Sequence, residues 1–333
     1  MKKMPIAEAV GTTLAHDVTQ VVQGGFKGVV LKKGHVIRAE DLDLLRSIGK
    51  ENLYVLDLED GEVHENDAAT AVAEVVRGDG VRLTEAHEGK VNVVAQADGL
   101  FCTRPEDLLL INRRRGVALV TVPDRTPVRA GQVVAAVKII PLTIQQAELQ
   151  QAMQPELFSV KAYMPLTVGI VTTGREVYSG RIKDAFGPVL RRKLAPYGLS
   201  ILGQEIVPDE RERIVAAIRG YLEAGAQLVL VTGGMSVDPD DLSPAAIRAA
   251  GAQIESYGAP ILPGSMFVLA YAGSVPILGL PACVIHDPLS TFDLVLPRLL
   301  TGERVAWDDI AAMGTGGMLG GREVHYPSVV PLD

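Results

Sequence analysis

The pattern of hydrophobic and polar residues changes near the middle of the chain. Before residue 141, short apolar runs alternate with Gly, Asp and Pro, which is typical of strands joined by turns. We interpret five of these runs as strands: 29–31, 54–56, 91–94, 117–122 and 133–137. The first half is therefore predicted to be a β-rich α+β region in two lobes.

Two amphipathic helices are expected between these strands. One covers residues 39–48 and is followed by Gly49, a residue type that often ends a helix. The other covers residues 66–77, with Asn66 as its expected N-terminal cap. Apolar residues recur at helical spacing in both: Leu42, Leu45 and Ile48 in the first, and Ala69, Val72, Ala73 and Val76 in the second.

After Pro165 the pattern becomes strand, glycine-rich turn and helix, repeated. Residues 166–171 are almost continuously apolar, as in a strand that is covered on both faces. Further strands are expected at 199–207 and 228–231, and helices at 184–197 and 209–224. This alternation predicts an α/β domain with a mostly parallel sheet, right-handed crossovers and helices on both faces.

These patterns divide the chain into five parts. Pro141, Pro155 and Pro165 bracket a glutamine-rich segment that favours a short connecting helix or linker. The predicted parts are a small α+β lobe (1–65), a β-rich module (66–150), a linker (151–165), the α/β domain (166–312) and a Gly-rich spacer with a C-terminal tail (313–333).

Ligands of such sheets bind beyond the carboxyl ends of the strands, which selects the loops 172–180, 233–241 and 280–288. The segment from Thr232 to Ser236 combines two glycines with hydroxyl side chains. Such a loop can hold an anion through backbone N–H groups and hydroxyls. The alternative is a tight turn that holds no ligand.

Aspartates crowd the same region. Asp238, Asp240 and Asp241 follow the glycine turn, and Mg²⁺ is usually held by one or two carboxylates together with substrate phosphates. The alternative is that these side chains are solvated helix caps. Ser243 is expected to cap the next helix, and Asp209 taken by itself is expected to cap the helix that it precedes.

Composition narrows the choice of partners. The net charge of −8 gives no general electrostatic reason to bind nucleic acid or an anionic membrane. No apolar run approaches the roughly 20 residues needed to cross a bilayer, and the N-terminus lacks the apolar core of a signal peptide. The two cysteines are too few for a disulfide framework. We therefore expect a soluble protein of the cytoplasm.

The second half contains short motifs in a definite order: Val171-Thr172-Thr173-Gly174, Asp184, Ile206-Val207-Pro208-Asp209, Val231-Thr232-Gly233-Gly234-Met235-Ser236-Val237, Asp241, Pro263-Gly264 and Leu278-Gly279-Leu280-Pro281. This order resembles the molybdopterin-binding domain shared by molybdopterin adenylyltransferase, molybdopterin molybdenumtransferase and gephyrin. The resemblance covers about residues 166–302. It implies a three-layer α/β domain that binds molybdopterin, a phosphorylated pterin. The implied binding residues are Thr172, Thr173, Gly174, Asp184, Gly233, Gly234, Met235, Ser236, Pro263, Gly264, Leu280, Pro281 and Cys283.

The spacing of the motifs is most similar to the molybdenumtransferase branch, which inserts molybdate into adenylylated molybdopterin and releases the nucleotide. By that resemblance Asp209 and Asp241 are the expected catalytic residues. Asp241 and Asp238 are the expected ligands of Mg²⁺, which would offset negative charge as the nucleotide leaves. We also expect a homo-oligomer.

The chain departs from the usual molybdenumtransferase motifs at four places. The usual Gly-Asp-Glu is replaced by Gly174-Arg175-Glu176, and the usual Asp-Ser-Asn by Asp184-Ala185-Phe186. The usual Pro-Gly-Lys-Pro is replaced by Pro263-Gly264-Ser265-Met266. The usual Leu-Pro-Gly-Asn-Pro is replaced by Leu280-Pro281-Ala282-Cys283-Val284. Two functions therefore stay open. One is a molybdenumtransferase-like enzyme, and the other is a non-catalytic carrier or sensor of the cofactor that serves a client molybdenum enzyme.

Several other residues have two interpretations. Cys283 with His286 could form an activated nucleophile or metal contact, or could simply pack. Arg175 could pair with a ligand phosphate or be a solvated loop charge. The run 113–115 of three arginines favours a solvated turn, and His64 with Glu65 and Asp67 favours a helix cap over a metal site. Residues 61–69 and the strand-rich part after them also resemble, more weakly, a β-clip type module.

Overall fold

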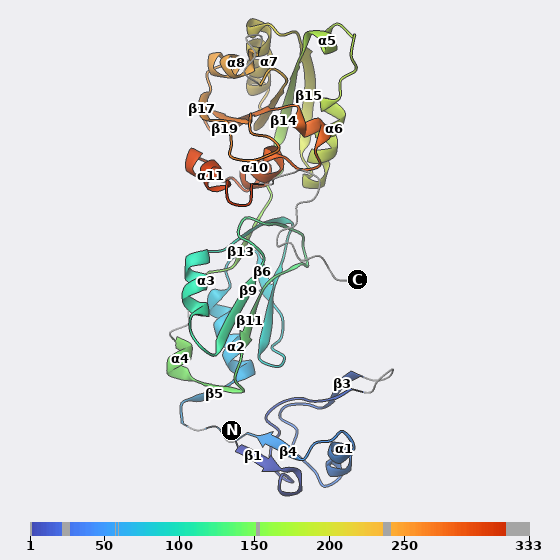
Figure 1. The fold of residues 1–333 in the computed structure, drawn as a ribbon, viewed down its shortest axis with the longest axis vertical. Coiled ribbons are helices and arrows are strands. Elements are labelled where there is room, and N and C mark those ends of the chain that lie inside the picture. The colour runs from blue at the N-terminus through green and yellow to red at the C-terminus, as the bar shows by residue number, and fades with distance from the viewer. Residues whose placement is uncertain are drawn as a thin grey trace. The chain divides into compact units, whose positions relative to one another are not determined.

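The computed structural model describes residues 2–21, 27–56, 58, 60–150, 154–235 and 241–317 (Figure 1). The chain forms two compact units, Met1–Ala162 and Tyr163–Asp333. Within the described residues, no helix is long and apolar enough to cross a membrane.

The first unit begins with a small lobe built around its own apolar core. Its elements are β1 (Lys2–Pro5), η1 (Ile6–Glu8), β2 (Val18–Val21), β3 (Lys27–Leu31), α1 (Asp41–Ser47) and β4 (Asn52–Val55). β1 pairs antiparallel with β4, and β2 pairs antiparallel with β3. Leu14, Ile37 and Leu45 are buried in the core. The helix predicted at 39–48 is confirmed as α1, with slightly shorter bounds.

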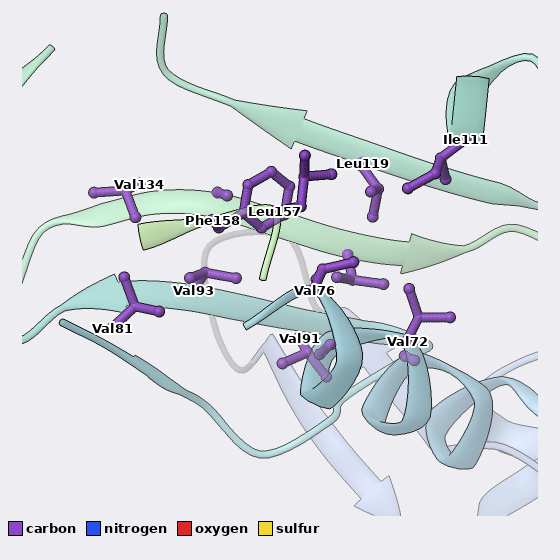
Figure 2. Packing of buried hydrophobic residues seen from close by; sticks show 14 of the residues in the cluster. Val72, Val76, Val81, Val91, Val93, Ile111, Leu119, Val134, Leu157 and Phe158 are labelled. Carbon is purple, nitrogen blue, oxygen red and sulfur yellow. The ribbon is translucent and has the colours of Figure 1, made fainter. Parts of the chain in front are cut away.

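The rest of the first unit packs one long helix against antiparallel strands. Its elements are β5 (Glu62–His64), α2 (Glu65–Val76), β6 (Val81–Leu83), β7 (Lys90–Ala95), β8 (Gly99–Cys102), α3 (Pro105–Asn112), β9 (Val117–Thr121), β10 (Pro127–Val128), β11 (Val133–Ile139), β12 (Thr143–Gln145), α4 (Gln146–Gln150) and β13 (Ser159–Ala162). The sheets have the strand orders β6-β7-β11-β9, β10-β8-β13 and β12-β5. Figure 2 shows Val72 and Val76 of α2 in the core beside Val91 and Val93 of β7.

The cap of α2 confirms the interpretation of the His64 segment as a helix cap, whereas the expectation that Asn66 is the cap is wrong. His64 is the N-cap, and its Nδ1 accepts a hydrogen bond of 3.1 Å from the Asn66 backbone N–H. The Asn66 side chain instead accepts a hydrogen bond of 2.6 Å from the Gly89 N–H, which fixes the turn before β7. His64 is buried at the start of α2, and its imidazole accepts a hydrogen bond from a backbone N–H of the first turn. A short polar side chain was expected in this role.

The segment 151–165, which the sequence suggested as a linker, contributes to the core of the first unit. Leu157 and Phe158 are fully buried, and Figure 2 shows both among the core side chains. β13 then pairs antiparallel with β8, and the Gly78 N–H donates to the Phe158 carbonyl at 2.8 Å. The first unit therefore continues to Ala162, and the second unit begins at the next residue, Tyr163.

The second unit is the three-layer α/β domain that the sequence predicted. Its elements are β14 (Thr167–Thr173), α5 (Arg175–Tyr178), α6 (Phe186–Leu194), η2 (Ala195–Tyr197), β15 (Ser200–Val207), α7 (Arg211–Glu223), β16 (Leu228–Thr232), α8 (Ser243–Ala249), β17 (Gln253–Tyr257), β18 (Val268–Ala272), β19 (Val275–Leu280), α9 (Cys283–His286), α10 (Thr291–Leu300) and α11 (Trp307–Ala312). The six-stranded sheet has the order β15-β14-β16-β19-β18-β17. β15, β14, β16 and β19 are parallel to one another. β18 pairs antiparallel with β19 on one side and with β17 on the other.

Each face of this sheet carries its own apolar cluster. Val168 and Ile170 of β14 pack on the face covered by α6 and α10, while Val171 packs on the face covered by α7 and α8. Alternate residues of a strand point to opposite faces, so a strand that is covered on both sides must be apolar throughout. This requirement explains the continuous apolar run at 166–171.

We predict that Phe158→Ala destabilises the first unit by about 3–5 kcal/mol, because it leaves a cavity in a closed core. Hydrogen exchange of the β7 and β11 amides in increasing urea measures this change. Lys161→Ala, at an exposed position of β13, is the matched control and is expected to have little effect. Equal exchange in Phe158→Ala and the wild type would show that this segment is a linker.

Candidate functional site

The three loops selected from the sequence lie at one edge of the sheet. Thr172 is in register with Thr232, and Thr232 is in register with Leu280, so β14, β16 and β19 end side by side. The loop between β17 and β18, which contains Pro263 and Gly264, lies at the same edge because Val268 pairs with Gly279 near the end of β19. The predicted convergence of these motifs is therefore confirmed.

Gly233 occupies the most crowded position of this edge. A Cβ atom at Gly233 would lie 2.4 Å from the Thr173 carbonyl oxygen and 2.8 Å from its Oγ1. The φ angle of Gly233 is +86°, a conformation that other residues rarely adopt. The turn after β16 thus approaches the end of β14 as closely as only glycine permits.

Ser243 holds the glycine turn in place. Its hydroxyl donates to the Gly233 carbonyl at 2.7 Å, and its backbone N–H donates to the Gly234 carbonyl at 3.3 Å. The expectation that Ser243 caps α8 is therefore wrong, since Leu242 is the N-cap and Ser243 belongs to the first turn. Asp241 is partly buried beside this turn, with its Cα 3.6 Å from the Cβ position of Gly234.

Ser236, Asp238 and Asp240 lie outside the described residues. Two other expected site residues have buried side chains. Met235 is buried, with its Sδ 2.6 Å from the Cβ position of Gly279. Leu280 is also fully buried. Among these, Met235 and Leu280 can meet a ligand only through their backbone groups.

The Thr173 hydroxyl is a buried polar group whose hydrogen-bonding capacity is not used within the described residues. The residue is 4% exposed, and its Oγ1 has no hydrogen-bond partner among the described residues. A buried hydroxyl without a partner costs about 1–3 kcal/mol. Its position beside Gly233, at the edge where ligands of parallel sheets bind, suits contact with a ligand oxygen.

Asp209 braces the loop that follows β14. Its Oδ2 accepts a hydrogen bond of 2.8 Å from the Arg175 backbone N–H, and the Gly174 N–H donates to the Val207 carbonyl at 3.2 Å. The expectation that Asp209 caps the following helix is wrong, because α7 begins at Arg211 with Glu210 as its N-cap. Asp209 instead connects the ends of β14 and β15.

Asp184 holds the start of α6. Its Oδ1 accepts from the Phe186 N–H at 2.9 Å, and its Oδ2 accepts from the Gly187 N–H at 3.1 Å. The same Oδ2 accepts a 2.7 Å hydrogen bond from Nε2 of Gln204 in β15. Gln204 belongs to no sequence motif. Its contact with Asp184 arises because the sheet places β15 beside this loop.

Cys283 does not have the surroundings of an activated nucleophile. Burial raises the pKa of its thiol, and the nearby carboxylates of Asp287 and Asp293 raise it further. The thiol is therefore protonated at neutral pH, and a thiol is a weaker nucleophile than a thiolate. His286, at the end of α9, is exposed.

Other contacts attach the remaining loops to the helices. Thr291 at the start of α10 donates to the Gly264 carbonyl at 2.9 Å. Lys193 of α6 contacts both carboxylate oxygens of Asp293 at 2.8 and 2.9 Å and donates to the Pro288 carbonyl at 2.7 Å. These bonds fix the positions of the Pro263-Gly264 loop and of the chain after α9.

Exposed cations lie in the loop region that follows β14. Arg175 begins α5, and Arg181 and Lys183 follow in the connection to α6. The carboxylates of Glu176 and Asp184 lie in the same segment, so the three cations exceed the anions there by one. The arrangement of hydroxyl, backbone and guanidinium donors suits an anionic ligand.

Two family models match separate parts of the chain. Residues 3–57 match a domain of unknown function (DUF8806), and residues 169–301 match the family described as a probable molybdopterin binding domain. The second match contains every motif on which the resemblance was based.

Individual relatives match shorter stretches. The molybdopterin molybdenumtransferase of Synechococcus elongatus is 30% identical over 115 residues, which are 32% of this chain and 28% of that protein. The CinA-like protein of Mycobacterium leprae is 36% identical over 75 residues, 22% of this chain and 18% of that protein. The chain thus spans less than a third of the length of these relatives.

Among solved structures, the molybdopterin biosynthesis enzyme MoaB from Thermus thermophilus matches 41% of this chain and 98% of its own chain, with 25% identity and a TM-score of 0.35. The family match rests on residues 169–301, which include β15, β16 and β19 and all but the first two residues of β14. They also include the glycine turn and the loops around it. Residues 169–301, the larger part of the second unit, are therefore similar to the family described as a probable molybdopterin binding domain.

Proposed function

We propose that the second unit binds molybdopterin at the edge formed by the ends of β14, β16 and β19. The observation that carries this proposal is the buried Thr173 hydroxyl, which has no partner among the described residues and lies beside the Gly233 turn. Hydroxyl and backbone N–H groups of this kind can hold phosphate oxygens. The family match supplies the phosphorylated pterin as the ligand class.

The cations near the site support an anionic ligand. Arg175 begins α5 directly after Gly174, and its backbone is fixed by Asp209. Its exposed guanidinium can form paired hydrogen bonds with a phosphate. Arg175 therefore favours phosphate binding in the place where the related enzymes usually have a carboxylate.

We further propose that the bound form is the adenylylated one and that the unit assists molybdate insertion. Asp241, beside the glycine turn, would hold Mg²⁺ together with the phosphates of the substrate, an arrangement that needs only one or two protein carboxylates. Mg²⁺ there would offset the charge on the leaving nucleotide. Asp209 would keep the β14 loop in position while Thr173 binds the ligand.

The alternative function is a carrier or sensor that binds the cofactor for a client molybdenum enzyme. The observations that favour it are the neutral Cys283 thiol and the substitutions at Arg175 and Ser265, which remove groups typical of the molybdenumtransferase motifs. Binding requires only the glycine turn and its donors, whereas nucleotide release also requires Asp241. The two functions therefore differ in one measurable step.

We predict that Gly233→Ala weakens molybdopterin binding by roughly tenfold or more, because the added Cβ forces the turn away from Thr173. Titration of the ligand into the full chain, followed by fluorescence, measures the dissociation constant. Gly273→Ala is the matched control, since Gly273 has a φ of +62° but no atom within 4 Å of its Cβ position. Unchanged binding in Gly233→Ala would place the ligand elsewhere.

We predict that Asp241→Ala reduces nucleotide release by roughly a hundredfold when the protein is mixed with adenylylated molybdopterin, molybdate and Mg²⁺. Chromatography of the released AMP measures this step, with Asp308→Ala on the exposed surface of α11 as the control. Tight binding without any release by the wild type would contradict the enzyme and favour the carrier.

A further inference from the structure

A network of polar side chains lies beneath the candidate site. Gln204 of β15 donates through Nε2 to Thr172 Oγ1 at 3.0 Å and to Asp184 Oδ2 at 2.7 Å. The Thr232 hydroxyl donates to the same Thr172 oxygen at 3.2 Å. One amide thus connects the end of β14, the neighbouring β16 and the start of α6.

We propose that Gln204 is a positioning residue of the ligand site. In this role it holds Thr172 and Asp184 so that the Thr173 hydroxyl, the glycine turn and the loop before α6 keep the spacing that the ligand needs. The inference rests on the proposed binding of molybdopterin to this edge, and it adds a residue that touches no ligand atom itself.

The orientation of the Gln204 amide is determined by its neighbours. Asp184 offers only acceptors when it is ionised, so the NH₂ group must face it, because the amide oxygen would be repelled. The amide oxygen lies against α6, where a Cβ on Gly187 would be 2.1 Å from Gln204 Oε1. The side chain therefore has a single arrangement that satisfies both Asp184 and Thr172.

The network acts at short range on the groups proposed to bind the ligand. Thr172 and Thr232 are fully buried, and each directly precedes a site residue, Thr173 and Gly233 respectively. A shift of Thr172 relative to Thr232 would change the distance between the Thr173 hydroxyl and the Gly233 turn. Groups that orient contact residues in this way typically contribute roughly ten- to hundredfold to affinity in metal sites, and we expect a similar range here.

The test replaces the amide with groups that keep its size but change its donors. Gln204→Glu places a second carboxylate next to Asp184, and two carboxylates that share a site raise the pKa of one of them. At neutral pH the two charges repel each other, and we expect molybdopterin affinity to fall by roughly tenfold or more. As the pH falls through the raised pKa, the introduced carboxyl gains a proton, donates to Asp184 and restores binding.

Gln204→Leu removes the donors at every pH, so its loss of affinity is expected to persist where Gln204→Glu recovers. Dissociation constants for molybdopterin are measured on the full chain between about pH 5 and pH 8 and divided by the wild-type value at each pH, which removes the titration of the ligand phosphate. Gln227→Glu is the matched control: it lies at the amino end of β16, where Oε1 accepts from the Thr167 N–H at 3.1 Å. We expect it to bind as the wild type does.

The outcomes separate this inference from the proposed function. A wild-type chain that does not bind molybdopterin sinks the proposed function and this inference with it. A wild-type chain that binds, with a Gln204→Leu variant of equal affinity, overturns the inference alone. If Gln204→Glu is folded and weak at neutral pH but does not recover on acidification, the inference also fails, since a purely structural defect would not reverse with pH.

Discussion

The close approach of two backbone segments, the Gly233 turn and the end of β14, is the constraint on which the site depends. Because β14 and β16 are in parallel register up to Thr172 and Thr232, the next residues, Thr173 and Gly233, lie at the same level of the sheet. Only a glycine can follow Thr232 without striking the Thr173 carbonyl. The bond from Ser243 to the Gly233 carbonyl then keeps the turn in place.

Most polar side chains around this turn form hydrogen bonds that fix the position of another residue. Asp209 fixes the backbone at Arg175, Asp184 fixes the start of α6, and Gln204 connects Asp184 to Thr172. Each of these side chains bonds to an element that is distant in sequence. In the proposed site, the direct ligand contacts are thus few, and their accuracy depends on a surrounding set of hydrogen bonds.

The fold of the second unit could be predicted because its signals are local. Apolar runs, helical spacing and glycine turns identified the strands and helices, and the rule for parallel sheets placed their loops at one edge. The contacts of individual polar residues could not be predicted in the same way. Ser243 and Asp209 have the local pattern of helix caps, but their side chains bond instead to Gly233 in the turn after β16 and to Arg175 after β14. Gln204 has no local pattern at all.

The first unit shows the same limit in its core. Prolines and glutamines indicated a linker at 151–165, yet Leu157, Phe158 and Val160 pack into a core whose other members come from earlier in the chain. The apolar residues of this segment give no sign in the sequence of the distant strands and helix on which they pack. His64 also capped α2 where Asn66 was expected, because burial and a neighbouring carbonyl of Ala15 fix the imidazole.

The late position of β13 has a consequence for how the protein is made. This strand completes the sheet of the first unit by pairing with β8, and the first strand of the second unit begins only five residues after it, at Thr167. During synthesis, domains usually fold in order from the N-terminus. The first unit can close only after its last strand leaves the ribosome, when translation of the second unit is already under way. The hydrophobic surface around Phe101 thus remains incomplete until Phe158, 57 residues later in the chain, has been made.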